Sequence, residues 1–386
     1  AFLLNRSSDL EAKHLAERVP DNSVHLTVTS IPFEELFTYS GKLTDVGNNG
    51  STIDCRAGRF ALNMRFVVEQ LYRVTAPGCN VCIHIQQLLA YKNQHGFSGR
   101  RDFRGAMIDV FTVAGEIAAH EIGPDGRALP YVVPALGGDG FRFIGETAIP
   151  KDPQQMAQRL NLHSLQFKTG HSRSATDWAM APNDYVLIFQ KPGEAQDPVR
   201  PLLYHESKKP LSREAFFEKL GEKDDVAWLK HLRDWGRKHK GINLAGWLCP
   251  EDWIKWASGI WPDIMQTDVL DGWKSARESD EEKHVCPLQL SLIRRLILLY
   301  TNPVSIQPNV TVLDPFMGIG SVAFAAIGGE CNEGRIVEPR NAIGFELKES
   351  YHAQALRNVK KARKDLAKWL KRGEAKSLLS GMEVPA

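Results

Sequence analysis

Hydrophobic and polar residues follow two different periods in the N-terminal half of the chain. Residues 25–29 alternate as a strand does, whereas residues 60–75 place apolar side chains at helical spacing (Phe60, Met64, Val67, Val68 and Leu71). A second apolar strand, Cys79–Ile85, follows a Pro77-Gly78 turn. This order of strand, helix and strand predicts a parallel sheet in an α/β protein.

The other N-terminal patterns are less regular. We expect helices over residues 9–19 and 109–120 and a strand over Tyr185–Gln190. Glycine and proline are dense between residues 123 and 145, which is typical of a mobile loop. Residues 194–210 have the composition of a linker.

The C-terminal part returns to the α/β pattern. It predicts an amphipathic helix over Pro287–Tyr300, a strand over Asn309–Asp314, a strand over Asn341–Leu347 and a basic helix over residues 349–372. Between the two halves, residues 211–283 hold seven of the nine tryptophans and are largely helical in pattern. We expect most of these tryptophans to form the core of a small subdomain.

These changes divide the chain into three parts, 1–200, 201–283 and 284–386. The composition, with 43% hydrophobic and 24% charged residues, excludes a wholly disordered chain. The formal net charge of +2 excludes a uniformly basic nucleic-acid coat, so contacts with a polyanion must come from local patches.

Membrane and metal signals are weak. No apolar run reaches the roughly 18 residues that a membrane span needs, and the six scattered cysteines indicate a reducing compartment, so we expect a cytoplasmic protein. Cys79 and Cys82 form a C-x-x-C pair without a second pair. Their simplest interpretation is a buried strand, and we expect no metal site.

The strongest chemical signal lies at the end of the strand before Asp314. The segment Val310–Ser321 is an apolar strand that enters a Gly-x-Gly turn and opens a helix, with glycines at Gly318 and Gly320. Such a turn lets a ligand approach the backbone and the helix N–H groups. Glu346, at the end of the next strand, can accept hydrogen bonds from both hydroxyls of a ribose. The dinucleotide-binding motif has a third glycine, which this turn lacks, so the turn fits a dinucleotide poorly.

A second signal, Thr29–Phe33, follows the first strand. Ser30 offers a hydroxyl, Ile31 offers a main-chain carbonyl that Pro32 holds extended, and Phe33 offers a flat face for stacking. These groups suit an exocyclic amino group on a planar base, although four residues alone also fit an ordinary loop.

Together the two motifs resemble those of the DNA amino-methyltransferases, which methylate the amino group of adenine or cytosine. The family's catalytic motif is Asp/Asn/Ser-Pro-Pro-Tyr/Phe, and this chain has Ser30-Ile31-Pro32-Phe33. The family's cofactor motif Asp-Pro-Phe-x-Gly-x-Gly matches the run from Asp314 to Gly320, which includes Pro315 and Phe316. The catalytic motif comes first, which resembles the permuted order called the β group.

The resemblance implies S-adenosylmethionine as the cofactor, held by the glycine turn, by the ribose-binding Glu346 and by the helix start at Pro287 and Leu288. It implies a Rossmann-like methyltransferase sheet with a helical, Trp-rich target-recognition insertion. It also implies double-stranded DNA as the partner, base flipping, and a role in restriction-modification. Ile31 in place of the first proline, followed by Tyr39-Ser40, resembles methylases of bacteriophages and prophages.

Several alternatives stay open. Ser30 favours cytosine N4, because the Asp of the family motif is typical of the N6-adenine enzymes. The departure at Ile31 leaves room for a catalytically silent DNA-binding relic, and an RNA methyltransferase is a further alternative. Carbon-5 methylation of cytosine needs a cysteine nucleophile, usually after proline, and no Pro-Cys pair occurs in the chain. A homodimer and a partner nuclease also stay open.

Three basic clusters are candidates for phosphate contact. They are Lys230–Lys240, the arginines Arg100, Arg101 and Arg104, and residues 355–372 of the C-terminal helix. On that last helix, Leu356, Val359, Leu366 and Leu370 are expected to form the apolar face.

Overall fold

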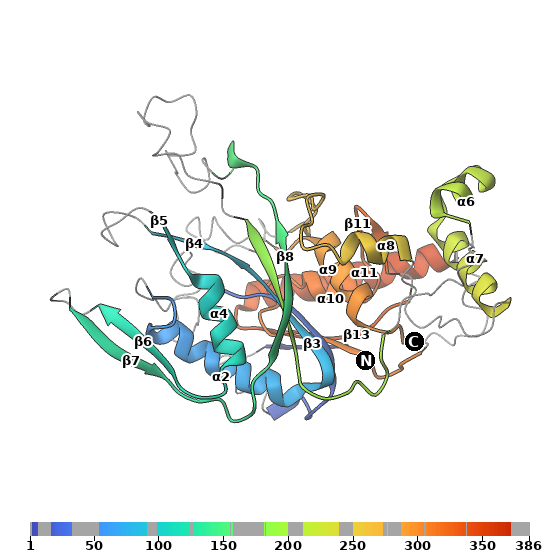
Figure 1. The fold of residues 1–386 in the computed structure, drawn as a ribbon. Helices are drawn as coiled ribbons and strands as arrows, with labels where there is room; N and C mark the ends of the chain where they lie inside the picture. Colours follow the sequence, from blue (N-terminus) through green and yellow to red (C-terminus); the bar gives the residue numbers. More distant parts are fainter. Residues whose placement is uncertain are drawn as a thin grey trace.

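The structure is a computed structural model built around one main sheet (Figure 1). In the described residues this sheet has seven strands in the order β1-β13-β10-β2-β3-β9-β8. The described residues are 2–6, 17–32, 54–90, 99–122, 125, 127–154, 156, 181, 183–199, 211–238, 250–272, 276, 287–304, 306–336 and 338–371.

Strand directions confirm most of the predicted parallel sheet. The five strands β1 (Phe2–Arg6), β13 (Asn341–Glu346), β10 (Thr311–Asp314), β2 (Val24–Ser30) and β3 (Thr75–Gln86) pair in parallel. β9 (Asp184–Gln190) then runs antiparallel to β3, and β8 (Arg142–Ile149) runs antiparallel to β9. The sequence pattern indicated the β9 strand and not its direction.

Helices cover both faces of the sheet (Figure 1). α2 (Gly58–Val74) and α4 (Phe103–Thr112) pack on one face, over β3 and β8. α9 (Leu290–Tyr300), α10 (Ser321–Ala326) and α11 (Glu349–Lys371) pack on the other, over the strands from β3 to β1. Crossover helices between parallel strands explain why the sheet is buried on both sides.

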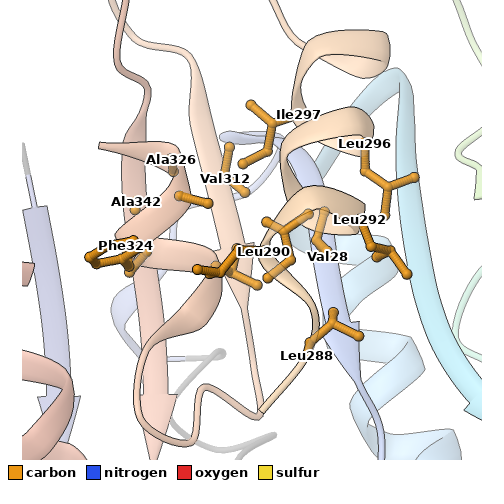
Figure 2. Packing of buried hydrophobic residues seen from close by; sticks show 14 of the residues in the cluster. Val28, Leu288, Leu290, Leu292, Leu296, Ile297, Val312, Phe324, Ala326 and Ala342 are labelled. Atoms are coloured by element: carbon orange, nitrogen blue, oxygen red, sulfur yellow. The ribbon is translucent and has the colours of Figure 1, made fainter. Parts of the chain in front are cut away.

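The two faces carry separate hydrophobic cores. Figure 2 shows the core under α9 and α10, where Val28 and Val312 of the sheet meet Leu292, Leu296 and Phe324 of the helices. A second core on the α2 and α4 side includes Ile83. Alternate side chains of one strand point to opposite faces, so β3 supplies Cys82 to the first core and Ile83 to the second.

Two predictions between residues 98 and 145 are wrong. The helix expected at 109–120 is α4, which begins six residues earlier, and residues 117–122 form the strand β6 (Ile117–Ile122). The expected mobile loop at 123–145 contains β7 (Ala128–Val133), which forms a hairpin with β6, and the start of β8. Among the described residues, β4 (Leu88–Ala90) and β5 (Gly99–Arg101) form another short pair.

The position of α4 follows from its cap and its apolar face. Asp102 accepts a hydrogen bond from the Gly105 amide and begins the helix. Buried side chains then recur at helical spacing: Phe103, Ala106, Met107, Val110 and Phe111. The basic residues at 100, 101 and 104 obscure this face in the sequence.

The Trp-rich region is helical where the structure describes it. It contains α6 (Arg213–Leu220), α7 (Asp225–Lys238) and α8 (Pro250–Trp256). Trp228 of α7 is buried and lies 5.5 Å, between ring centroids, from Phe216 of α6. Trp256 and Trp261 are also buried, and they belong to the core under α9. Residues 256–261 therefore anchor the end of this region to the main sheet layer.

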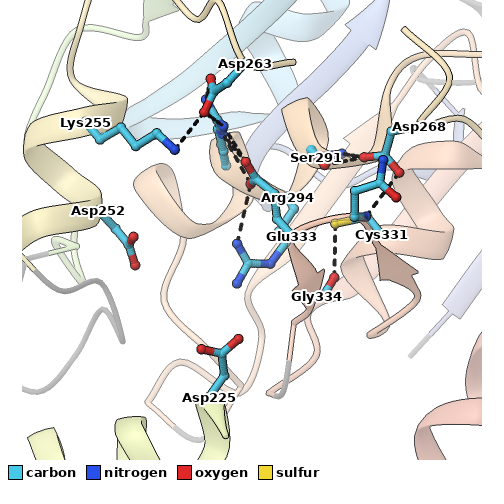
Figure 3. A network of polar contacts seen from close by, with 12 residues as sticks. Asp225, Asp252, Lys255, Asp263, Asp268, Ser291, Arg294, Cys331, Glu333 and Gly334 are labelled. Carbon is cyan, nitrogen blue, oxygen red and sulfur yellow. Dashed lines mark hydrogen bonds and ion pairs between the residues drawn. The ribbon is translucent and has the colours of Figure 1, made fainter. Parts of the chain in front are cut away.

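A polar network joins this region to α9 (Figure 3). The fully buried Arg295 donates hydrogen bonds to Asp263 at 2.8 and 3.0 Å and to Glu333, which lies between β11 (Glu330–Cys331) and β12 (Gly334–Arg335). Asp268 accepts hydrogen bonds from the amide and hydroxyl of Ser291. Asp268 thus caps the N-terminus of α9 from a distant part of the chain.

The C-terminal helix is confirmed, and its apolar face differs from the predicted one. Val359 and Leu366 are buried as expected, whereas Leu356 is 46% exposed. Tyr351, Ala355 and Ala362 complete the buried face instead. α11 is amphipathic, and in the described part of the chain no helix has the length and apolar character of a bilayer span.

Candidate functional site

Both sequence motifs end at the same edge of the main sheet. Parallel strands bring their carboxyl ends together, and β2, β10 and β13 are neighbours. Ser30 ends β2, Asp314 ends β10 and Glu346 ends β13. The fold therefore places the two motifs side by side, although 284 positions separate Ser30 from Asp314 in the chain.

The turn after Asp314 needs its glycines for conformation. Gly318 and Gly320 have φ values of +55° and +87°, which side chains other than glycine rarely adopt. The Met317 amide donates to the Phe345 carbonyl at 2.8 Å, which joins the turn to β13. The buried Asn358 of α11 donates to the Ile319 carbonyl at 2.9 Å. The turn is thus held by β13 on one side and by α11 on the other.

Glu346 is anchored beside this turn. Its carboxylate accepts a hydrogen bond from the Gly318 amide at 2.8 Å and one from the Lys348 amide at 2.8 Å, one on each oxygen. These two bonds orient the carboxylate beside the glycine turn.

The space around Gly318 fits a ligand at this position. No heavy atom lies within 4 Å of the place where a Cβ at Gly318 would stand. At Gly320, by contrast, a Cβ would lie 3.0 Å from the Ala355 Cβ. The first glycine faces open space and the second faces helix α11.

Alanine substitutions at the two glycines should therefore differ. We expect Gly318→Ala to cost about 1 kcal/mol of unfolding free energy, from backbone strain alone. Gly320→Ala should cost about 3 kcal/mol, because contact with Ala355 adds to the strain. Urea unfolding of the two variants measures the difference, and equal losses would contradict the contact at Ala355.

A buried hydrogen bond connects the two motifs. The Thr29 hydroxyl donates to Asp314 Oδ1 at 2.6 Å, and the Phe316 amide donates to the same oxygen at 3.1 Å. Burial raises the pKa of the Asp314 carboxyl to about 7, although both hydrogen bonds favour the ionised form. Thr29 directly precedes Ser30, so this bond fixes the spacing between the two motifs.

The raised pKa of Asp314 predicts a pH-dependent stability. In the unfolded chain the carboxyl has its ordinary pKa of 3.8, while in the folded protein it stays protonated up to about pH 7. The folded state therefore binds more protons in that window, and the stability from Asp314 is lost as pH rises through the folded pKa. From about pH 5 to about pH 8, we expect a loss of about 2–3 kcal/mol.

Asp314→Asn removes this titration and keeps an acceptor for Thr29. The unfolding free energy of the variant, relative to the original protein, should rise by about 2–3 kcal/mol from about pH 5 to about pH 8. Urea titrations at both pH values measure the difference. A difference that stays constant with pH would contradict the assignment.

The catalytic motif is described as far as Pro32. Ser30 is half-buried, while Ile31 and Pro32 are buried. The Ile31 side chain belongs to the core on the α2 and α4 side. Phe33 lies outside the described residues, as do Tyr39 and Ser40.

Sequence reasoning missed a row of polar side chains that begins at Ser30. Ser30 Oγ lies 3.0 Å from His84 Nδ1, and His84 Nε2 lies 2.9 Å from Asp184 Oδ2. Lys151 Nζ lies 2.5 Å from the same Asp184 oxygen. These residues come from β2, β3, β9 and the segment after β8. The one signal in the sequence is that His84 interrupts the apolar run from Val81 to Ile85.

The remaining site candidates are less informative. Leu288 is buried in the same core as Val28 (Figure 2), and Pro287 is half-buried.

Among the residues whose positions are described, no group of three or more potential metal ligands lies together. Burial raises the pKa of the Cys79 thiol to about 11 and that of Cys82 further. Neutral thiols are poor metal ligands.

The basic clusters have mixed outcomes. Arg104 forms a two-pronged ion pair with Glu146, with N–O distances of 2.5 and 2.7 Å. On α11, the exposed residues include Lys360, Lys361, Arg363, Lys364 and Lys368. Most side chains of the Lys230–Lys240 cluster lie outside the described residues. DNA contact by any of the three clusters stays a prediction.

A parallel sheet with a glycine turn and an anchored glutamate at its carboxyl edge is the arrangement of nucleotide-binding α/β enzymes. The sequence model of the N6/N4 DNA methylase family matches residues 24–357. The chain belongs to this family of DNA methylases.

Two individual proteins are similar to the chain, one in part of its sequence and one in its fold. The type II methyltransferase M.BglI of Bacillus subtilis is 36% identical over 137 residues, which cover 35% of this chain and 31% of that protein. The alignment thus spans about a third of the relative's length. A candidate DNA modification methylase from Thermus thermophilus, solved in complex with S-adenosyl-L-methionine, has a similar fold. Its TM-score is 0.50 at 17% identity, covering 94% of each chain.

Proposed function

We propose that the protein transfers a methyl group from S-adenosylmethionine to the exocyclic amino group of cytosine, at N4, in duplex DNA. The observation that carries this proposal is the meeting of the two motifs at one sheet edge, linked by the bond between Thr29 and Asp314. Family membership supports the reaction class.

The glycine turn and Glu346 would hold the cofactor, which supplies an electrophilic methyl group. The two Glu346 oxygens would accept the ribose hydroxyls, and the open space at Gly318 would admit the ligand against the backbone. Asp314, Pro315, Phe316 and Gly320 shape this turn. Pro287 and Leu288 are candidates for covering the bound cofactor. That role rests on the sequence resemblance alone.

Ser30 and the Ile31 carbonyl would bind the target amino group. Its nitrogen lone pair is delocalised into the base, so two hydrogen bonds that favour a tetrahedral nitrogen would turn the lone pair toward the methyl group. The side chain of Ile31 is buried in a core, which supports a role through the main chain. Pro32 restrains that main chain, so the family's usual proline is dispensable at position 31.

The target base would leave the duplex before it reacts, because a stacked amino group is out of reach. Phe33 would stack on the flipped base, an expectation that rests on its place in the motif. Cytosine N4 is proposed over adenine N6 because the motif begins with serine. A role in restriction-modification and a phage or prophage origin rest on the sequence resemblance alone.

Methyl transfer from labelled S-adenosylmethionine to duplex DNA, RNA and protein tests the proposal. Label should enter duplex DNA alone. Label in RNA would move the assignment to an RNA methyltransferase. No label in any substrate, with cofactor bound, would indicate a silent DNA-binding protein.

A further inference from the structure

The function proposed above uses only Ser30 of the polar row that runs from Ser30 to Lys151. It crosses four neighbouring chain segments at the carboxyl edge of the sheet and is almost closed to solvent. The His84 and Asp184 side chains are 9% and 6% exposed, and that of Lys151 is 7% exposed. Burying three ionisable groups is costly unless each is paired, so this arrangement calls for an explanation.

Asp184 lies between the two basic side chains of the row, Lys151 and His84. Burial opposes the ionisation of Asp184, yet its contacts with His84 and Lys151 hold its pKa below the ordinary value. Asp184 is therefore a carboxylate, and Lys151 balances its charge. With this ion pair in place, a row without net charge carries one proton on the imidazole ring.

The hydrogen bonds then assign the protons. A carboxylate can only accept, so the proton of the neutral imidazole lies on Nε2 and points to Asp184. Nδ1 is then an acceptor, and the hydroxyl of Ser30, 3.0 Å away, must donate to it. A serine whose only proton is used in this way can only accept from a further partner.

We propose that His84 is a positioning residue that takes the Ser30 hydroxyl proton in a hydrogen bond, so that Ser30 Oγ presents only lone pairs to the target. Asp184 and Lys151 hold the imidazole in the tautomer that this needs. The inference rests on the proposed function and adds a selectivity to it. An acceptor-only oxygen binds an amino N–H, and it rejects thymine, whose O4 is itself an acceptor.

Substituting His84 by Asn or by Gln tests the roles of its two ring nitrogens separately. Asn places an oxygen near the position of Nδ1, and Gln places a donor near that of Nε2. His84→Asn should keep an acceptor for Ser30 and stay within about 5-fold of the original single-turnover rate. His84→Gln should lose about 100-fold in that rate while the affinities for S-adenosylmethionine and DNA stay unchanged.

The control is to make His84→Asn and His84→Gln in a protein that also carries Ser30→Ala. If His84 acts through Ser30, the Asn and Gln variants should have equal rates there, because no hydroxyl is left to orient. Equal rates in the original background, or a difference that persists without Ser30, would overturn the positioning role.

A second measurement does not depend on activity. Nitrogen-15 NMR of the imidazole of His84 should show a protonated Nε2 and an unprotonated Nδ1, with a shift of the Nδ1 signal in Ser30→Ala. The opposite tautomer, or a doubly protonated ring, overturns the inference whether or not the protein methylates DNA. Correct NMR signals with no methyl transfer to any substrate would instead reject the proposed function.

Discussion

Glu346→Ala should remove most of the affinity for S-adenosylmethionine. The two carboxylate oxygens are each anchored by a backbone amide and, in our account, each accepts one ribose hydroxyl. Hydrogen bonds to a charged group contribute about 1.5–3 kcal/mol each, so losing two should weaken binding by about 3 kcal/mol or more. That loss corresponds to a dissociation constant raised more than about 100-fold.

Calorimetric titration with S-adenosylmethionine measures this loss. Glu349→Ala is the matched control, since it removes the same charge from an exposed position three residues later, at the start of α11. The control should bind as the original protein does. Unchanged affinity in Glu346→Ala would place the cofactor elsewhere.

Ser30→Ala should reduce methyl transfer strongly without affecting the cofactor. The hydroxyl would act on the amino group as it becomes tetrahedral, so its loss is expected in kcat. Removing one such oriented polar group typically lowers the rate by about 100-fold or more. Thr29 and Asp314 remain in place, so the glycine turn and cofactor affinity should be preserved.

Rapid-quench measurement of a single turnover tests this expectation. Ser23→Ala is a suitable control, because Ser23 lies just before the opposite end of β2 and its hydroxyl donates to the Pro20 carbonyl. The control should keep the original rate. A Ser30→Ala variant with unchanged turnover would exclude Ser30 from the site.

Local patterns in the sequence were enough to locate the glycine turn and the glutamate beside it. The strand before Asp314, the positive-φ glycines and the strand that ends at Glu346 depend on neighbours in the chain, and all three occur as expected. The parallel order of their strands followed from the α/β rhythm. Phe33 stays a prediction, because it lies outside the described residues.

Long-range pairing explains what the sequence could not predict. His84 and Asp184 are 100 positions apart, and they meet because β9 runs antiparallel beside β3. The cap of α9 is likewise distant, since Asp268 precedes Ser291 by 23 positions. A hydrophobic pattern indicates which residues are buried but not which strand lies beside another. Polar partners across strands therefore become visible only in the folded structure.

Mass spectrometry of nucleosides tests the central claim most directly. Unmethylated duplex DNA of mixed sequence is incubated with the protein and S-adenosylmethionine, and the digested nucleosides are then compared with an incubation lacking the protein. The account predicts N4-methyldeoxycytidine. N6-methyldeoxyadenosine alone would reject the cytosine assignment and leave the cofactor site standing, whereas DNA without any methylated base, from a protein that binds the cofactor, would contradict the account.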